Sequence, residues 1–139
     1  MSRSPQQPAT PDEILAAAYR RAQERARDCV ARGELVPLEV LAQRMRTTHE
    51  SITDSVWAGR LFSVPVGERV FFPVFFAEPG LARADLEFVI PGLASREPWS
   101  KFVFFTTGKA PLGGSTPIEA LKRGMRDCVR RMAQAFNES

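Results

Sequence analysis

The segment at residues 38–58 restricts the fold of this 139-residue chain more than any other. Residues 38–45 carry apolar side chains at helical spacing, and residues 49–58 do so again around Ile52 and Val56. A short polar turn separates the two stretches. Two short amphipathic helices joined by so tight a turn must pack against each other, and the segment therefore predicts a helix-turn-helix unit.

A pair of strands is expected directly after these helices. Residues 61–66 and 70–76 are rich in β-branched and aromatic side chains, and Gly67-Glu68-Arg69 separates them, which predicts a hairpin. Pro65 and Pro73 lack a backbone donor, so we expect both strands to lie at sheet edges. Two short helices, a turn and a hairpin are the pattern of a winged helix-turn-helix.

Two phenylalanine pairs, Phe71-Phe72 and Phe75-Phe76, lie in the second predicted strand. Consecutive residues of a strand point to opposite faces, so the four rings cannot all enter one interior. Most of them are expected in the core. At least one side of the strand must then be covered by another helix or by a partner.

The start of the chain predicts a tail followed by a long helix. Residues 1–9, rich in Ser, Pro and Gln, are typical of a disordered tail. The sequence Thr10-Pro11-Asp12-Glu13 is a strong helix start, because the threonine hydroxyl can accept from the third amide and the glutamate can complete a capping box. We expect this helix to run to about Arg32 and to end at Gly33.

The N-terminal helix carries an apolar stripe at helical spacing. Its members are Leu15, Ala18, Tyr19, Ala22, Ala26, Cys29 and Val30. Either the rest of the chain or a second copy of it must cover this stripe, which favours a homodimer.

The C-terminal part predicts further helices. A short amphipathic segment spans residues 81–90, a helix starts at Glu97-Pro98-Trp99, and Thr116-Pro117-Ile118-Glu119 repeats the N-terminal capping pattern. The last helix is expected to continue from there to Phe136. One of its faces is basic, and the pattern leaves open whether that face meets nucleic acid or protein. The basic residues are Lys122, Arg123, Arg126, Arg130 and Arg131.

These patterns together predict a mainly α fold. A winged helix-turn-helix with a small β-hairpin is flanked by a long N-terminal helix and a C-terminal helical unit. We expect the tail at residues 1–9, the N-terminal helix at 10–33, the winged helix-turn-helix at 34–78 and the C-terminal helical domain at 79–139. A hydrophobic content of 44% is sufficient for a packed interior.

Composition restricts where in the cell this protein is expected and which classes of partner it can bind. No apolar run approaches the length of a membrane span, and the start lacks the apolar block of a secretory signal. The two cysteines, Cys29 and Cys128, are best interpreted as buried free thiols in a reducing cytoplasm. A net charge of +3 permits a nucleic-acid partner without requiring one.

Catalysis finds little support in the residue pattern. His49 is the single histidine and lies at a predicted helix start, where a capping or surface role is the better interpretation. No Ser/His/Asp set and no metal-ligand spacing can be assembled, so we predict a protein that is not an enzyme and has no cofactor or metal.

Two stretches resemble known bacterial proteins. In the first, a helix ends in Ala-Gly-Arg-Leu-Phe at residues 58–62 and a glycine-containing hairpin leads to a Phe-Pro strand, which is similar to a MerR-like helix-turn-helix. The second resembles the C-terminal domain of the Xre/MbcA/ParS antitoxins. It carries Pro98-Trp99, Leu112-Gly113-Gly114, the Thr-Pro-Ile-Glu-Ala-Leu run at 116–121, and Gly124. The two resemblances cover residues 38–124.

The resemblance implies a protein that neutralises a toxin through its C-terminal domain, while its helix-turn-helix binds its own promoter. The glycine pair is best interpreted as a tight turn before a capped helix, and in the resembling family this turn and helix meet the toxin. The implied partner-binding residues are Leu112, Gly113, Gly114, Thr116, Pro117, Glu119 and Arg123.

The DNA-binding part of this expectation depends on the outer face of the second helix, at residues 49–58. A recognition helix must bring donors to base edges and keep anionic groups away from phosphates. Glu50 and Asp54 place carboxylates on the outer face, contrary to this requirement. Arg46 and Ser55 stand where the family has other residue types. The candidate DNA-binding residues are Arg44, Arg46, Thr48, His49, Ser51, Thr53, Arg60 and Arg69.

Two hypotheses therefore stay open. The first is an antitoxin-like, DNA-binding transcriptional regulator that binds a toxin protein and operator DNA. The second is a protein–protein interaction adaptor whose helix-turn-helix is a scaffold that does not bind DNA.

Overall fold

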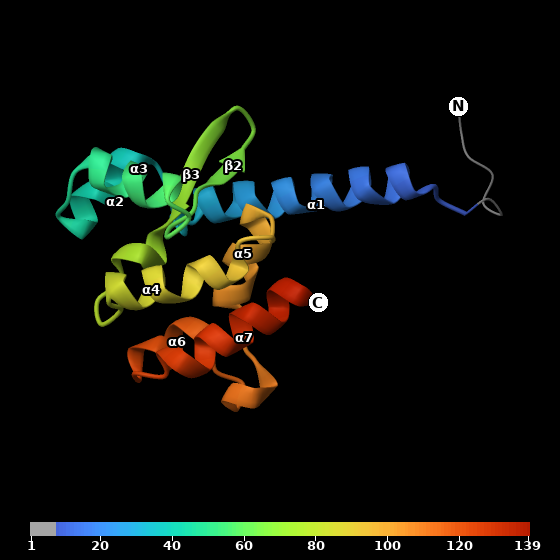
Figure 1. Cartoon of the computed structure of the whole chain (residues 1–139). Helices are drawn as coiled ribbons and strands as arrows, with labels where there is room; N and C mark the ends of the chain where they lie inside the picture. The colour runs from blue at the N-terminus through green and yellow to red at the C-terminus, as the bar shows by residue number, and fades with distance from the viewer. Residues whose placement is uncertain (1–7) are drawn as a thin grey trace.

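The structure, a computed structural model, describes residues 8–139 and is mainly helical with one small antiparallel sheet (Figure 1). The predicted fold class is confirmed. Residues 1–7, which make up most of the predicted tail, lie outside the described part. In chain order the elements are α1 (Pro11–Ala31), β1 (Leu35–Val36), α2 (Leu38–Met45), α3 (His49–Trp57), β2 (Val64–Val66), β3 (Arg69–Pro73), the 3₁₀ helix η1 (Val74–Ala77), α4 (Arg83–Val89), η2 (Ile90–Leu93), α5 (Pro98–Thr106), η3 (Ala110–Leu112), α6 (Pro117–Lys122) and α7 (Arg126–Glu138).

Helix α1 begins and ends where local signals place it. The Thr10 hydroxyl accepts a hydrogen bond from the Glu13 amide at 3.2 Å, and Gly33 beyond the last turn has a φ of 75°. Only the C-terminal half of the helix packs on the body, where Ala26 and Cys29 are buried. The N-terminal half projects away from the rest of the chain (Figure 1).

Helices α2 and α3 form the predicted bihelical unit. Leu41 and Ile52 are completely buried where the helices face the core, and Thr48 caps α3 by accepting from the Ser51 amide at 3.0 Å. Between the helices, Arg46 adopts a left-handed backbone with a φ of 56°. A glycine would adopt this backbone conformation without steric cost.

The sheet differs from the predicted hairpin in three ways. Strand β1, which the sequence pattern did not predict, pairs with β3, and the strand order is β1-β3-β2. The expectation that Pro73 keeps its strand at a sheet edge was therefore wrong. Pro73 is the last residue of β3, and the next amide, that of Val74, donates to the Glu34 carbonyl at 2.9 Å. The missing amide proton of Pro73 therefore interrupts the hydrogen bonds between β1 and β3 only at their end. Both hairpin strands are also shorter than predicted.

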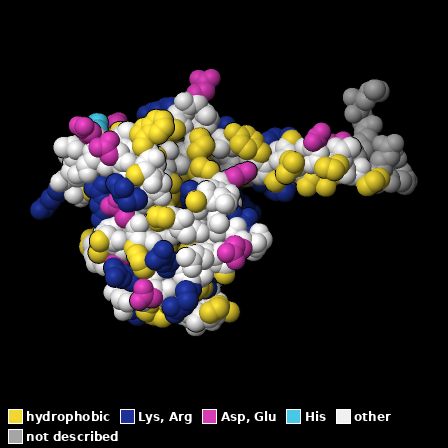
Figure 2. All heavy atoms as spheres, in the orientation of Figure 1, with side chains coloured by type: hydrophobic (Ala, Val, Ile, Leu, Met, Phe, Trp, Pro, Cys, Tyr) yellow, Lys and Arg dark blue, Asp and Glu magenta, His cyan; other side chains and the backbone are white. Residues whose placement is uncertain are grey.

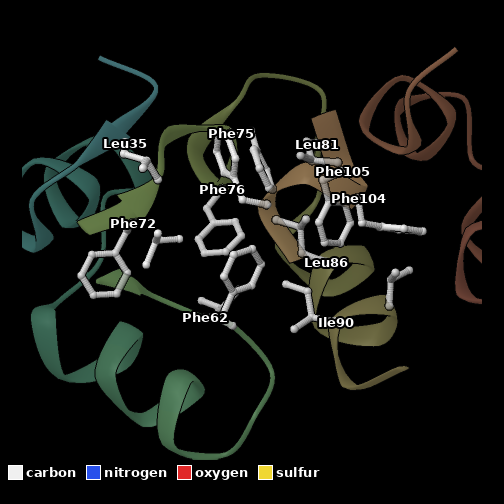
Figure 3. Close-up of a cluster of buried hydrophobic side chains, with 14 of the residues drawn as sticks. Leu35, Phe62, Phe72, Phe75, Phe76, Leu81, Leu86, Ile90, Phe104 and Phe105 are labelled. Atoms are coloured by element: carbon white, nitrogen blue, oxygen red, sulfur yellow. The ribbon is translucent and has the colours of Figure 1, made fainter. Parts of the chain in front are cut away.

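All four hairpin phenylalanines are buried within the chain. The chain leaves the strand after Pro73 and enters η1, so Phe75 and Phe76 do not continue the strand alternation. Helix α5 covers Phe75: its ring lies 5.3 Å from that of Phe105 and 5.9 Å from that of Phe102, centroid to centroid. Figure 3 shows the rings of Phe75, Phe76 and Phe105 gathered at the centre of this cluster.

The predicted single C-terminal helix is divided into α6 and α7. Gly124 has a φ of 81°, which breaks the helix between Lys122 and Arg126. Helix α7 then packs on η2 and α4 through Val129 and Ala133, which are fully buried. One hydrophobic cluster includes buried residues from α1 through to α7. The division of the chain after residues 33 and 78 stays a prediction.

Candidate functional site

The arginines predicted to meet DNA lie in α2, in the turn after it, after α3 and in the hairpin of β2 and β3, which we call the wing. Arg44, Arg46, Arg60 and Arg69 are all exposed. Among residues 8–139, Arg46 is the one non-glycine residue with a positive φ, and such a conformation costs an L-residue about 1–2 kcal/mol. Arg46 is thus an exposed, left-handed residue directly after α2.

Hydrogen bonds made by Gln23 of α1, a residue that the sequence pattern did not indicate, connect this helix with the wing. The Gln23 side-chain amide donates to the Pro65 carbonyl at 2.9 Å, and its oxygen accepts from the Gly67 amide at 3.0 Å. Arg69 at the same hairpin places its guanidinium 5.3 Å from the centre of the Phe71 ring. No local pattern identifies Gln23, since its partners lie more than 40 positions along the chain.

The outer face of α3 is only partly available for contact with DNA. Arg83 of α4 donates to the Ser51 hydroxyl at 3.0 Å and to the buried Ser55 hydroxyl at 2.8 Å. Glu87 accepts from Arg83 at 2.8 Å, from Arg60 at 2.8 Å and from Ser55 at 3.0 Å. Two predicted DNA contacts, Ser51 and Arg60, are therefore already bonded within the chain.

The Glu87 carboxylate is held in its charged form. Burial raises the pKa of this carboxyl, but the hydrogen bonds from Arg60, Ser55 and Arg83 together outweigh burial, so the pKa lies below its ordinary value of 4.5. Ser55 is thus part of a polar network that connects α3 with α4.

The remaining α3 candidates differ in their availability. His49 is exposed and Thr53 is half-buried, while the Thr48 hydroxyl is used as the helix cap. Trp57, which the site predictions did not include, is 86% exposed at the C-terminal end of α3. An exposed tryptophan is unusual, and tryptophan is enriched at contact surfaces.

The loop at residues 108–116, which we call the docking loop, is closed on itself. The Lys109 amide donates to the Ser115 carbonyl and the Gly114 amide to the Lys109 carbonyl, each at 2.9 Å. A Cβ atom at Gly108 would lie 2.4 Å from the Gly114 carbonyl oxygen, so only glycine fits at this approach. Gly113 and Gly114, with φ of 66° and 90°, form the predicted tight turn.

The predicted capping box at the start of α6 is present. The Glu119 amide donates to the Thr116 hydroxyl at 3.2 Å, and the Thr116 amide donates to the Glu119 carboxylate at 2.9 Å. These bonds from the Thr116 backbone and side chain lower the pKa of Glu119. Glu119 and Arg123, one turn apart, are both exposed.

The segment from Leu112 to Arg123 is partly core and partly surface. Leu112 and Pro117 are buried and Thr116 is half-buried, whereas Gly113 and Gly114 are exposed. A partner can thus reach the glycine turn and the outer face of α6, but not the apolar side chains beneath them.

The basic face of the C-terminal helices contacts α4 and the segment before it. The guanidinium groups of Arg126 and Arg130 lie 4.7 and 4.5 Å from the centre of the Phe88 ring. Lys122 forms an ion pair with Glu78 at 2.8 Å. These three side chains therefore stabilise packing inside the chain.

A groove of about 580 Å³ lies between α1 and α5. Apolar side chains, among them Trp99 and Phe102, line it together with Arg25 and Arg32 of α1. Cys29 also lines the groove, and burial raises the pKa of its thiol to about 11. This thiol is therefore protonated at neutral pH and is not a ready nucleophile.

Comparison of the chain with known protein families, curated proteins and solved structures gave no match. Within residues 8–139, no helix combines the length and the apolar character that crossing a membrane requires. In the same range, no group of three or more His, Cys, Asp or Glu residues is placed to hold a metal ion.

Proposed function

We propose that this chain is an antitoxin-like, non-enzymatic regulator of the bacterial cytoplasm. It binds a partner protein, a toxin, through the docking loop and α6, and it binds operator DNA through the α2–α3 turn and the wing. The observation that carries the proposal is the docking loop itself. Its internal hydrogen bonds and the capping box give a rigid, exposed glycine turn beside Glu119 and Arg123.

Rigidity supports a docking role because a surface that is already ordered loses little conformational entropy on binding. The turn presents backbone without side chains, since a Cβ atom at Gly113 or at Gly114 would meet nothing within 4 Å. A partner can therefore approach the main chain closely. Glu119 on α6 and Arg123, the residue after the helix, then offer the partner one acceptor and one donor.

The partner interaction is tested with the product of the gene adjacent to the one that encodes this chain. We expect that protein to arrest growth alone and to be neutralised by co-expression of this chain. Gly113→Asn places a side chain on the turn while keeping a residue that tolerates positive φ. It should weaken the complex about tenfold or more by titration calorimetry.

Gly67→Asn is the matched control for this experiment. Gly67, at the wing, has a φ of 63°, and a Cβ atom added there would also meet nothing within 4 Å, so the same substitution is made at an equivalent backbone. It should leave the partner affinity unchanged. No complex with the adjacent gene product, or equal affinity for the Gly113→Asn variant, would count against the docking loop.

DNA binding is tested by fluorescence anisotropy with the DNA upstream of the chain's own gene, over a series of salt concentrations. Arg46→Ala keeps a Cβ atom at the left-handed position and removes only the guanidinium-bearing part of the side chain. It should weaken binding and reduce the salt slope by about one, since each phosphate contact contributes about 0.9 to that slope. Arg131→Ala, at an exposed position of α7, should change neither quantity.

A second candidate function is the adaptor that does not bind DNA. It is favoured by the polar network on α3, because Arg83 occupies Ser51 and Ser55 while Glu50 and Asp54 remain exposed. Absence of binding even at low salt, together with an intact partner complex, would support the adaptor and exclude the regulator.

A further inference from the structure

The groove between α1 and α5 has the size of a small-molecule site. Its volume of about 580 Å³ lies within the range of about 300–1,000 Å³ that such sites usually have. Side chains from α1, η1, α5 and α6, which are far apart in the sequence, meet in its wall. Neither the residues predicted to bind a toxin nor those predicted to bind DNA are among its lining residues.

Three aromatic rings of the lining form a stacked column. The Trp99 and Phe102 rings lie 5.3 Å apart with 21° between their planes, and the Phe102 and Phe75 rings lie 5.9 Å apart with 29° between theirs. Phe102 and Phe75 are buried, whereas Trp99 is half-buried and, within residues 8–139, stacks on Phe102 alone. A flat aromatic molecule in the groove would extend this column at Trp99, in an arrangement that aromatic rings favour.

The charges around the groove balance one another. Arg32 donates to the Glu34 carboxylate at 3.0 and 3.3 Å, so these two charges are already paired. The other charged residues of the lining are Arg25 and Asp28, which have opposite signs and lie three positions apart on α1. An ionised ligand would lose its water there without meeting a net opposite charge, which is unfavourable. The lining therefore favours an uncharged ligand.

We infer that the groove between α1 and α5 binds one small, flat, uncharged aromatic molecule, which stacks on Trp99. The half-buried side chains of Val103 and Ile118 add apolar surface beside the rings, so the ligand also gains from the removal of its edges from water. The inference is independent of the toxin and DNA contacts proposed above, and its test uses neither partner.

Fluorescence titration of the full chain with N-phenyl-1-naphthylamine is the first test. This probe is an uncharged aromatic molecule whose emission rises in apolar surroundings, and we expect one probe molecule to bind per chain. The matched probe is 8-anilino-1-naphthalenesulfonate, which has the same ring system with an added sulfonate. It should bind at least about tenfold more weakly. No saturable binding of the uncharged probe, or tighter binding of the anionic one, would overturn the inference.

Two variants test whether the probe lies in the groove. Val103→Phe fills the space and should weaken binding of the uncharged probe at least about tenfold. Trp99→Ala removes the stacking surface and should weaken it by about tenfold. Val70→Phe is the matched control, because it makes the same substitution on the wing at a residue that is 56% exposed, and it should leave the affinity unchanged. Circular dichroism checks that each variant is folded.

The projecting part of α1 is a second place where such a probe can bind. Figure 2 shows hydrophobic side chains along it, and Leu15 and Tyr19 there are 68% and 63% exposed. The double variant Leu15→Glu, Tyr19→Glu should nevertheless bind the uncharged probe as the wild type does. Loss of binding in this variant, or wild-type affinity in Val103→Phe, would place the probe outside the groove and refute the inference.

Sedimentation equilibrium tests whether a second copy of the chain occupies the groove instead. The wild type and Val103→Phe should have the same oligomeric state, because a small molecule and not protein is expected to fill the space. A change of oligomeric state in Val103→Phe would show that protein binds there and would overturn the inference.

Discussion

Replacement of Phe105 with alanine is expected to lower the free energy of unfolding by about 3–5 kcal/mol. The Phe105 side chain is completely buried, and its ring lies 5.3 Å from Phe75, 5.3 Å from Phe104 and 6.4 Å from Phe62. It joins α5 to η1 and to the segment after α3. The cavity left by the ring is lined by other rings that cannot all move to fill it. The variant therefore loses the free energy gained by burying the ring and also bears the cost of the cavity.

Urea denaturation followed by circular dichroism measures this loss. Because small domains are stable by only about 5–15 kcal/mol, the variant should unfold at a much lower urea concentration. The control is Trp57→Ala, which removes a similarly large ring from a position that is 86% exposed. That change should stay within about 0.5 kcal/mol. A Phe105→Ala variant that loses less than about 1 kcal/mol would show that the site is not part of a shared, close-packed core.

Replacement of Glu87 with glutamine is expected to cost about 1–3 kcal/mol at neutral pH, the usual range when a hydrogen-bonded charged group loses its charge. The Glu87 side chain is 19% exposed and accepts from Arg83, Arg60 and Ser55. Glutamine has nearly the same shape but offers one acceptor oxygen and no charge. Arg83, which is 29% exposed, would then keep its own bonds to α3 without a counterion.

The pH dependence of this difference follows from the lowered pKa of Glu87. A carboxyl whose folded pKa lies below its unfolded value contributes its full stability above the ordinary value of 4.5. That contribution is lost as the pH falls from 4.5 through the lower folded value. The gap in unfolding free energy between the wild type and Glu87→Gln should therefore be constant near neutrality and narrow in acid. Glu97→Gln, at an exposed position, should show no such gap. A gap that is unchanged in acid would mean that Glu87 acts through shape and not through charge.

The helices of this protein could be predicted because their signals are local. The Thr10 and Thr116 caps act on amides three residues away, and Gly33 ends α1 within one turn. The same reasoning located the tight turn at Gly113 and Gly114. It failed at Gly124, because a glycine within an apolar periodicity is compatible with either a helix or a break.

The candidate site was only partly predictable for the opposite reason. Sequence patterns named the arginines of the turn and wing, and these are exposed. They did not indicate that α4 would approach α3 and bond Ser51 and Ser55, since Arg83 lies 32 and 28 positions further along the chain. Nor did they indicate that Gln23 would hold the hairpin.

Residue spacing alone thus specified the helical class, the capped helix starts and the turn at Gly113 and Gly114, because a cap or a left-handed residue acts on its immediate neighbours. Packing in three dimensions decided the rest: the pairing of β1 with β3, the burial of all four hairpin rings and the α3–α4 network. It also left one half of α1 uncovered. Each of these depends on surfaces far apart along the chain, whose shape and charge match only after folding has brought them together.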